Sequence, residues 1–193
     1  MRKILIFIFL VFISLQNNSY ANEILPIKEG DNSSKIKLII YESLTCSHCA
    51  NFHNEVYPEL KKEFIDEGKI NIEFRNFPLD LAALNAAKIA HCKNDGASDI
   101  LHFLYSNQDT WIRGSNILEI NKNLENLIIN SEFNLDFDNC IKNKKIEDYI
   151  LEERIDGFKR YEIEATPTLI INDKKFNKTL NYKNLEKILK KML

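Results

Sequence analysis

Two cysteines separated by two residues, Cys46 and Cys49, are the side chains best suited to do chemistry. The motif Cys46-Ser47-His48-Cys49 follows the apolar run 38–41 and precedes a helical pattern that begins at Cys49. At a junction of strand and helix, the first sulfur lies beside unpaired backbone N–H groups and the positive end of the helix dipole, which favour thiolate over thiol. Cys46 is therefore the expected nucleophile, and Cys49, one turn later, is expected to resolve a mixed disulfide.

Three other side chains near the motif have types that could assist it. His48, as imidazolium or N–H donor, is expected to stabilise the Cys46 thiolate, and a stabilised reduced form makes the disulfide a stronger oxidant. Glu42 has two interpretations: a proton acceptor for Cys49 during exchange, or an acid at a strand end that reaches solvent. His53 is four residues beyond Cys49, and we expect it at the surface or half packed.

The segments on both sides of the motif predict the strands and the helix that position it. The polar, turn-rich segment 22–35 reads as a lead-in, and 37–43 reads as a buried strand because it is rich in β-branched residues. From Cys49, apolar residues recur every three or four positions, which predicts a helix kinked by Pro58. After Gly68, apolar and polar residues alternate in a second strand that begins at Ile70.

The rest of the chain divides into a helical stretch and a second α/β portion. Residues 79–156 show helical patterns without a convincing strand, so they read as a subdomain inserted into a domain made of 22–78 and 157–193. Residues 169–172 predict a strand that turns at Asn172-Asp173 into a shorter strand, and an amphipathic helix ends the chain. Pro167 must sit at the first residue of its strand or at an edge; a cis Thr166-Pro167 bond would leave backbone groups free to pair with an extended substrate.

The N-terminus reads as a secretory signal over residues 1–21. Arg2 and Lys3 are followed by an apolar segment too short to span a bilayer comfortably, and Ser19-Tyr20-Ala21 has the small-x-small form of a cleavage site. We expect cleavage after Ala21, with an uncleaved tether as the alternative. Removing two basic residues leaves 24 basic and 28 acidic ones, a net charge of −4, so no basic patch indicates nucleic acid.

Four cysteines after a secretion signal suggest two disulfides, although four cysteines allow three pairings. If Cys46 pairs with Cys49, then Cys92 pairs with Cys140 or both stay free. A bridge between Cys92 and Cys140 would close a loop of about 49 residues, worth roughly 4 kcal/mol at most in the chain-entropy model.

The order of these parts resembles the DsbA-type thiol:disulfide oxidoreductases of the bacterial periplasm, in which a helical domain interrupts a thioredoxin fold. The chain looks most like the α-proteobacterial branch of that group. The similarity extends over nearly the whole chain after the signal, and its strongest segments are Tyr41 to Ala50 (YESLTCSHCA), Phe74 to Asp80 (FRNFPLD), Ala86 to Cys92 (AAKIAHC), Trp111, and Ala165 to Asn172 (ATPTLIIN).

The resemblance implies roles for individual residues. Cys46 would be the exposed nucleophile, Cys49 its buried partner and His48 the histidine that stabilises the thiolate, while Thr166 and a cis Pro167 would bind the substrate backbone. Relatives of this branch carry a second cysteine pair in the helical domain, which favours a structural disulfide between Cys92 and Cys140.

The resemblance also implies partners and shows two departures. It implies reduced secreted or periplasmic proteins as substrates and a quinone-linked membrane reoxidant of the DsbB type. The exchange chemistry requires no cofactor or metal, and the sequence leaves the oligomeric state open, with a monomer as the default. Ser47 stands where relatives usually carry Pro, and the residues between the cysteines tune the potential. The acid of relatives aligns with Ile40, two residues before Glu42, and a two-residue offset keeps the same strand face.

Three alternatives compete with a disulfide-donating oxidase. A disulfide isomerase or reductase has similar parts, and Thr before the cis Pro is common among isomerases; the oligomerising stalk of periplasmic isomerases is not expected here. A metal-handling module could use Cys46, Cys49 and a histidine, but a closed zinc site needs four ligands and the sequence offers only one Cys-x-x-Cys. A purely structural Cys46–Cys49 bridge is disfavoured because so short a loop gives little entropic stabilisation.

Overall fold

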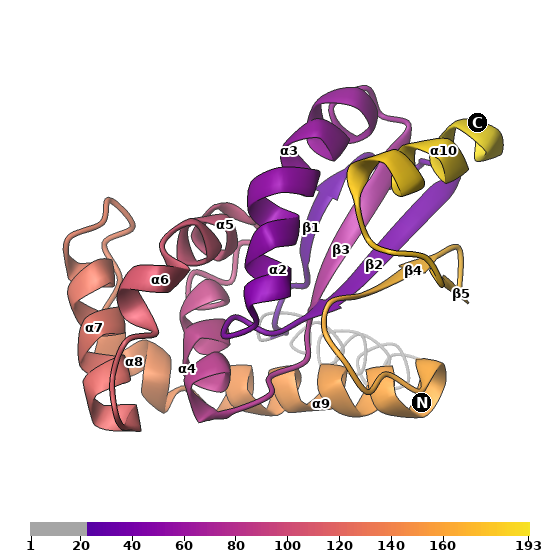
Figure 1. Ribbon diagram of the computed structural model, residues 1–193. Helices are drawn as coiled ribbons and strands as arrows, with labels where there is room; N and C mark the ends of the chain where they lie inside the picture. The colour runs from indigo at the N-terminus through magenta and orange to yellow at the C-terminus, as the bar shows by residue number, and fades with distance from the viewer. Residues whose placement is uncertain (1–22) are drawn as a thin grey trace, which may run out of the picture.

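The computed structural model of the protein describes residues 23–193 (Figure 1), so the predicted signal segment 1–21 lies outside the described residues. The strands are β1 (Ile27–Gly30), β2 (Ile36–Glu42), β3 (Ile70–Asn76), β4 (Thr168–Ile171) and β5 (Lys174–Lys175). The helices are α2 (Ser47–Asn51), α3 (Tyr57–Leu60), α4 (Leu81–Ala90), α5 (Asp99–Ser106), α6 (Gln108–Trp111), α7 (Ile117–Ile129), α8 (Phe137–Lys142), α9 (Lys144–Tyr161) and α10 (Tyr182–Met192), with π-helical turns η1 (Phe52–Val56) and η2 (Lys61–Ile65). None of the helices found within residues 23–193 has both the length and the apolar character needed to cross a bilayer.

The strands form one mixed sheet in the order β1-β3-β2-β4-β5. β2 and β3 are parallel, with Ile36 opposite Ile70, while β4 is antiparallel to β2 and β5 is antiparallel to β4. The sheet and its helices confirm the predicted α/β class. β1 was not predicted. It lies inside the segment that reads as a polar lead-in, and it pairs antiparallel with β3.

Alternation along β2 divides the core between the two faces of the sheet. Leu38 and Ile40 belong to the larger core, which also contains residues of α2, α3 and α10, whereas Tyr41 belongs to a smaller core on the other face. α9 covers that second face, on the side opposite α3 and α10 (Figure 1). Gly157 of α9 permits this close approach, since a Cβ there would lie 2.6 Å from the ring of Tyr41.

The helix that follows the Cys-x-x-Cys motif is continuous from Ser47 to Ile65 but irregular. The π-helical turn η1 comes immediately before α3, whose second residue is Pro58. Proline has no N–H to donate to the preceding turn, so the irregularity lies where the sequence predicts a kink. Gly68 ends the segment at φ +65°, a backbone conformation that suits glycine.

The helices α4 to α8 gather beside the sheet, and α9 extends from them along it (Figure 1). Residues 79–156 contain no strand in the structure, consistent with their helical patterns. The predicted boundary between residues 156 and 157 falls inside α9, which runs without a break from Lys144 to Tyr161 and packs on β3. One helix therefore joins the helical region to the sheet, and the division into two units stays a prediction.

Candidate active site

Cys46 is the residue immediately before α2, and its backbone is tied to both sides of the loop. Its N–H donates to the Ser43 carbonyl at 2.9 Å, and its own carbonyl accepts the N–H groups of Cys49 and Ala50, both at 3.1 Å. The short polar stretch after β2 therefore folds back and starts the helix at the first cysteine. This places the Cys46 sulfur at the helix N-terminus, as the motif predicts.

The surroundings of Cys46 stabilise its ionised form. Its side chain is partly exposed, and its Sγ lies 3.3 Å from the Thr166 carbonyl oxygen. The Cys49 thiol has the largest effect on the pKa of Cys46. Together with the side chain of Thr166 and the backbone N–H groups of Cys49 and His48, it lowers this pKa from 9.0 to about 5, against the opposing effect of burial. Thr166 Oγ1 is buried and forms no hydrogen bond in the structure, which leaves its O–H available to the thiolate.

Cys49 is only three residues after Cys46, but its environment favours the thiol over the thiolate. It is fully buried. Burial, the neighbouring Cys46 and the nearby Glu42 raise the pKa of Cys49 far above its ordinary value. The two sulfurs are unbonded in the structure, and the arrangement supports one reactive thiolate and one protonated thiol.

Glu42 lies at the end of β2, inside the protein and close to Cys49. It is only 4% exposed, so the interpretation of a strand-end acid that reaches solvent is wrong. Burial raises its pKa well above 4.5, and Cys46 adds to the increase. Its Oε2 contacts His53, while its Oε1 is buried with no hydrogen-bond partner. A protonated carboxyl with one free oxygen beside a buried thiol is placed for proton exchange with it.

The expectation that His53 lies at the surface or half packed is wrong. His53 is 5% exposed; its Nε2 lies 2.7 Å from Glu42 Oε2 and its Nδ1 lies 2.8 Å from His102 Nδ1. The environment of His53 comes from α5, 49 residues further along the chain, which no local pattern reveals. The only available signal was His102 itself, a polar residue inside the apolar run 100–104.

His48 contacts the thiolate through its backbone rather than its ring. Its backbone N–H contributes to the low pKa of Cys46, whereas its side chain is exposed in the first turn of α2. The predicted stabilising role of the imidazole therefore stays a prediction. Thr166 and Pro167 lie across from the motif, and the bond between them is cis. His48, Thr166 and Pro167 line the same surface hollow, of about 420 Å³.

Residues that sequence reasoning missed hold the loop in place. The buried Gln108 donates from Nε2 to the carbonyls of Leu44 (2.8 Å) and Cys46 (3.1 Å). Thr45 donates its hydroxyl to Asp80, which also caps α4. The helical region thus fixes the backbone that carries the nucleophile, through contacts that join segments far apart in the sequence.

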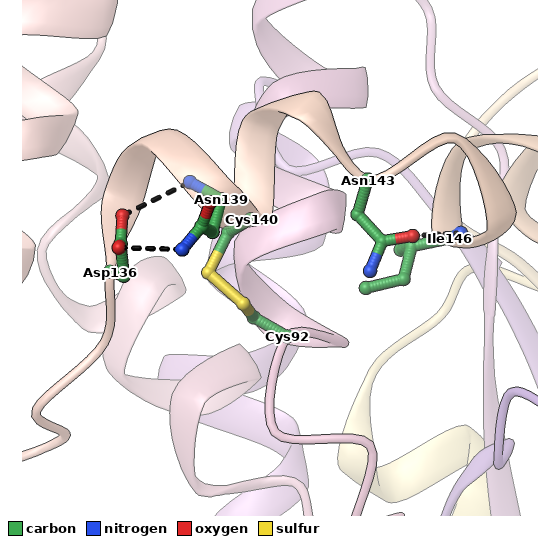
Figure 2. Close-up of a disulfide and its surroundings, with 6 residues drawn as sticks. All are labelled: Cys92, Asp136, Asn139, Cys140, Asn143 and Ile146. Atoms are coloured by element: carbon green, nitrogen blue, oxygen red, sulfur yellow. Dashed lines mark hydrogen bonds between the residues drawn. A yellow bond between two sulfur atoms is a disulfide. The ribbon is translucent and has the colours of Figure 1, made fainter.

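The second cysteine pair is distant in sequence from the first and forms a disulfide. Cys92 follows the end of α4, and Cys140 lies in α8 (Figure 2). Asp136 accepts hydrogen bonds from the backbone and side chain of Asn139 at the start of α8, and Asn143 caps α9 by accepting the N–H of Ile146. The bridge therefore joins two helices of the inserted region and contributes no side chain to the motif.

Metal ligation was one alternative for the motif. Within residues 23–193, no group of three or more His, Cys, Asp or Glu side chains is arranged to hold a metal ion.

The chain is similar in sequence and in fold to known proteins. A family model described as thioredoxin matches residues 25–191. A Rickettsia conorii protein, provisionally named a protein-disulfide oxidoreductase, is 30% identical over 146 residues, which are 74% of this chain and 52% of that protein. The chain thus spans about half the length of this curated relative.

Two solved structures extend the likeness to three dimensions. The crystal structure of Wolbachia pipientis alpha-DsbA1 has a TM-score of 0.74 and 29% sequence identity, covering 92% of this chain and 94% of that one. A protein titled protein-disulfide isomerase, from Novosphingobium aromaticivorans, has a TM-score of 0.76 at 21% identity, covering 87% and 98% of the two chains, and is similar in fold alone. These comparisons confirm the predicted fold, a thioredoxin fold with an inserted helical region.

Proposed function

We propose, from the premise that this chain belongs to the thioredoxin family, that it is a protein dithiol:disulfide oxidoreductase. In this proposal it donates the Cys46–Cys49 disulfide to reduced secreted proteins as they fold. The observation that carries the proposal is the contrast within the motif: the partly exposed Cys46 has a pKa of about 5, and the buried Cys49 has a raised pKa. A stable thiolate at the first position stabilises the reduced form and makes the disulfide a stronger oxidant.

The reaction proceeds by two thiolate exchanges. A substrate thiolate attacks Cys46 Sγ, the Cys46–Cys49 bond breaks, and Cys49 leaves as a thiolate that takes a proton from Glu42. The second substrate thiolate then attacks the substrate sulfur of the mixed disulfide, and Cys46 leaves as its stabilised thiolate. Two electrons have passed from the substrate dithiol to the enzyme, and the substrate holds a new disulfide.

The substrate is proposed to bind in the hollow beside the motif. Thr166 and Pro167 border this hollow together with His48 and lie next to the attacked sulfur. An extended chain there would bring its cysteine to Cys46 while the rest of it remains in solvent. Recognition through backbone groups suits a protein that meets many different sequences.

We further propose a periplasmic location, with residues 1–21 as a signal that is removed after export. The reduced dithiol must be reoxidised before the next turn, and a quinone-linked membrane protein of the DsbB type is the proposed acceptor of its two electrons. No cofactor or metal takes part in the exchange itself.

The test is the equilibrium of the Cys46–Cys49 pair in a glutathione redox buffer. A Cys92→Ser/Cys140→Ser variant, checked by mass spectrometry, isolates this pair from the structural bridge. We expect a strongly oxidising potential, nearer the value of about −120 mV of DsbA than the value of about −270 mV of thioredoxin. A potential near that of thioredoxin would overturn the oxidase and favour a reductase or isomerase, with Ser47 as the residue that retuned the motif.

A direct assay of turnover completes the test. The oxidised protein should oxidise a reduced two-cysteine peptide, and Cys46→Ala should abolish this reaction. Cys49→Ala cannot form the Cys46–Cys49 disulfide and should likewise fail to oxidise the peptide. If Cys46 of this variant is first converted to a mixed disulfide with nitrothiobenzoate, a peptide with a single thiol should displace nitrothiobenzoate and stay bound to Cys46, because no resolving thiol remains.

A further inference from the structure

Four side chains form a continuous row from the buried carboxyl beside Cys49 to the protein surface. Glu42 Oε2 lies 2.7 Å from His53 Nε2, His53 Nδ1 lies 2.8 Å from His102 Nδ1, and His102 Nε2 lies 2.8 Å from Glu29 Oε1. The residues come from β2, η1, α5 and β1, so the row exists only in the folded protein. We call it the relay row.

The outer end of the relay row opens at a hollow separate from the substrate site. Glu29 and His102 line a surface hollow of about 530 Å³ together with Tyr57 and Lys61. The hollow that contains His48, Thr166 and Pro167 shares none of these residues. Solvent can therefore reach one end of the relay row while a substrate occupies the other hollow.

The hydrogen bonds of the relay row are compatible with a single direction. Glu29 accepts from Tyr57 and Ser98 as well as from His102, and these hydrogen bonds outweigh burial and lower its pKa to about 2, so it is a carboxylate. His102 then donates from Nε2, and in the tautomer with its proton on Nε2 the Nδ1 atom is free to accept from His53.

The same logic continues to the inner end. Burial lowers the pKa of His53 to about 3, so this ring is neutral and, having donated from Nδ1, accepts at Nε2. The donor to that nitrogen is the protonated Glu42, whose pKa burial raises. Each hydrogen bond of the relay row therefore has one donor and one acceptor. Each shared proton can move from its donor atom to its acceptor atom without rotation of any side chain.

The groups packed around the relay row are mostly aromatic. The ring of Tyr105 stacks on His53 with centroids 4.0 Å apart, and Phe52 and Phe74 also contact His53. The charged or titratable groups that face the inner end are Cys46, Cys49 and Tyr105, whose hydroxyl is buried without a partner, and Lys61 faces Glu29 at 3.3 Å. This apolar sheath leaves the relay row as the hydrogen-bonded connection between Glu42 and the outer hollow.

We propose, on the basis of the proposed disulfide exchange, that His53 and His102 relay the proton between Glu42 and Glu29, so that buried Cys49 exchanges its proton with solvent behind the substrate site. When Cys49 attacks a mixed disulfide at Cys46, the Cys49 proton passes to Glu42 after Glu42 has given its own to His53. His53 in turn passes a proton to His102 and His102 passes one to Glu29, which releases it to water. When Cys49 leaves as a thiolate, the same transfers run inward.

The test follows the two sulfurs separately in the purified full-length protein. The reduced protein is mixed with 5,5′-dithiobis(2-nitrobenzoate) in a stopped-flow instrument. Cys46 thiolate attacks the reagent and releases one nitrothiobenzoate; Cys49 then loses its proton, displaces the second nitrothiobenzoate and forms the Cys46–Cys49 disulfide. The first phase reports on the nucleophile, and the second depends on proton removal from Cys49.

We expect His53→Gln and His102→Ala to slow the second phase by about a hundredfold, the lower end of the range of general acid–base effects, and to leave the first phase unchanged. Added imidazole should restore the second phase of His102→Ala, because the vacated site opens on the outer hollow. The matched control is His91→Gln: His91 is 2% exposed and hydrogen bonds to Asn76 outside the relay row, so both phases should remain as in the unchanged protein and show no response to imidazole.

Other outcomes separate the relay from the proposed function. An unchanged second phase in His53→Gln and His102→Ala overturns the relay and leaves the proposed oxidase intact. A redox potential near that of thioredoxin overturns the proposed oxidase function, but it does not change the two stopped-flow phases. If neither variant folds, the unchanged protein is measured in mixtures of H₂O and D₂O: a curved dependence of the second-phase rate on deuterium fraction supports transfer of several protons, and a linear dependence overturns it.

Discussion

At the scale of single residues, Cys46 and Cys49 show how position alone separates two identical side chains. Cys46 is partly exposed and receives hydrogen bonds that favour its thiolate, whereas Cys49 is fully buried near Glu42. The difference is what directed exchange requires, because one sulfur must react with substrates and the other must only react with its partner.

The ionisation of Cys46 gives a prediction with a defined pH dependence. Alkylation of the reduced protein by iodoacetamide should speed up as pH rises through about 5, because only the thiolate reacts. Cys49→Ala removes the strongest hydrogen bond to the thiolate and should raise this midpoint by about one pH unit, the equivalent of about 1.4 kcal/mol. A midpoint unchanged by Cys49→Ala would contradict this account.

His48→Ala tests the ring in the same titration. The His48 side chain is exposed, and only its backbone N–H acts on the Cys46 thiolate in the structure, so the midpoint should rise by less than in Cys49→Ala. If the midpoint does not move, the His48 side chain has no part in the mechanism.

The sequence marked the candidate reactive residues more clearly than it marked their surroundings. Cys46, Cys49 and Pro167 stand out because a motif of residue types marks them. Glu42 stayed ambiguous, and His53 was expected at the surface or half packed, because their burial depends on His102 and Tyr105 from α5. A local pattern cannot report a contact between residues that only the tertiary fold brings together.

At the scale of elements, the position of α9 against the sheet depends on one glycine. Gly157 faces the ring of Tyr41, which is fully buried and accepts a hydrogen bond from Arg75. The ring therefore cannot move aside easily when atoms are added at position 157.

Gly157→Ala should lower the free energy of unfolding by about 1–3 kcal/mol, the usual cost of overpacking a core. Chemical denaturation of the reduced protein measures this loss. Lys159→Ala, exposed on the same helix, is the control and should change stability by no more than about 0.5 kcal/mol. Equal stability of the two variants would mean that α9 does not need this close approach.

Among the elements, β1 was missed for a physical reason. It has four residues, and only Ile27 is buried. Such a strand has no periodicity to detect, and its pairing comes from β3, which lies more than forty residues later. β2 and β4 were predicted from their apolar runs, whereas β3 was predicted from the alternation of apolar and polar residues that its burial repeats.

At the scale of the whole molecule, stability and chemistry are assigned to different cysteine pairs. The Cys92–Cys140 bridge spans 48 positions and joins α4 to α8 within the helical region. It holds together the part of the molecule from which Gln108 reaches the active loop, but neither of its sulfurs contacts the motif.

The Cys92→Ala/Cys140→Ala variant should therefore lose up to about 4 kcal/mol of stability, the chain-entropy value for such a loop. Its rate of peptide oxidation should stay within about twofold of the unchanged protein, since distant sites act independently. Urea denaturation and the peptide assay measure the two quantities on the same sample. Loss of activity as complete as in Cys46→Ala would contradict the separation of roles.

The two edges of the sheet affect how readily an unfolded polypeptide could add to it as another strand. β1 has four residues, and β5 consists only of the exposed Lys174 and Lys175. A long apolar edge would let an extended polypeptide add itself as another strand and start aggregation, whereas short edges and lysines discourage this. In the proposed function, the protein can then hold each unfolded chain through the sulfur and the hollow beside it, and release it without starting an aggregate.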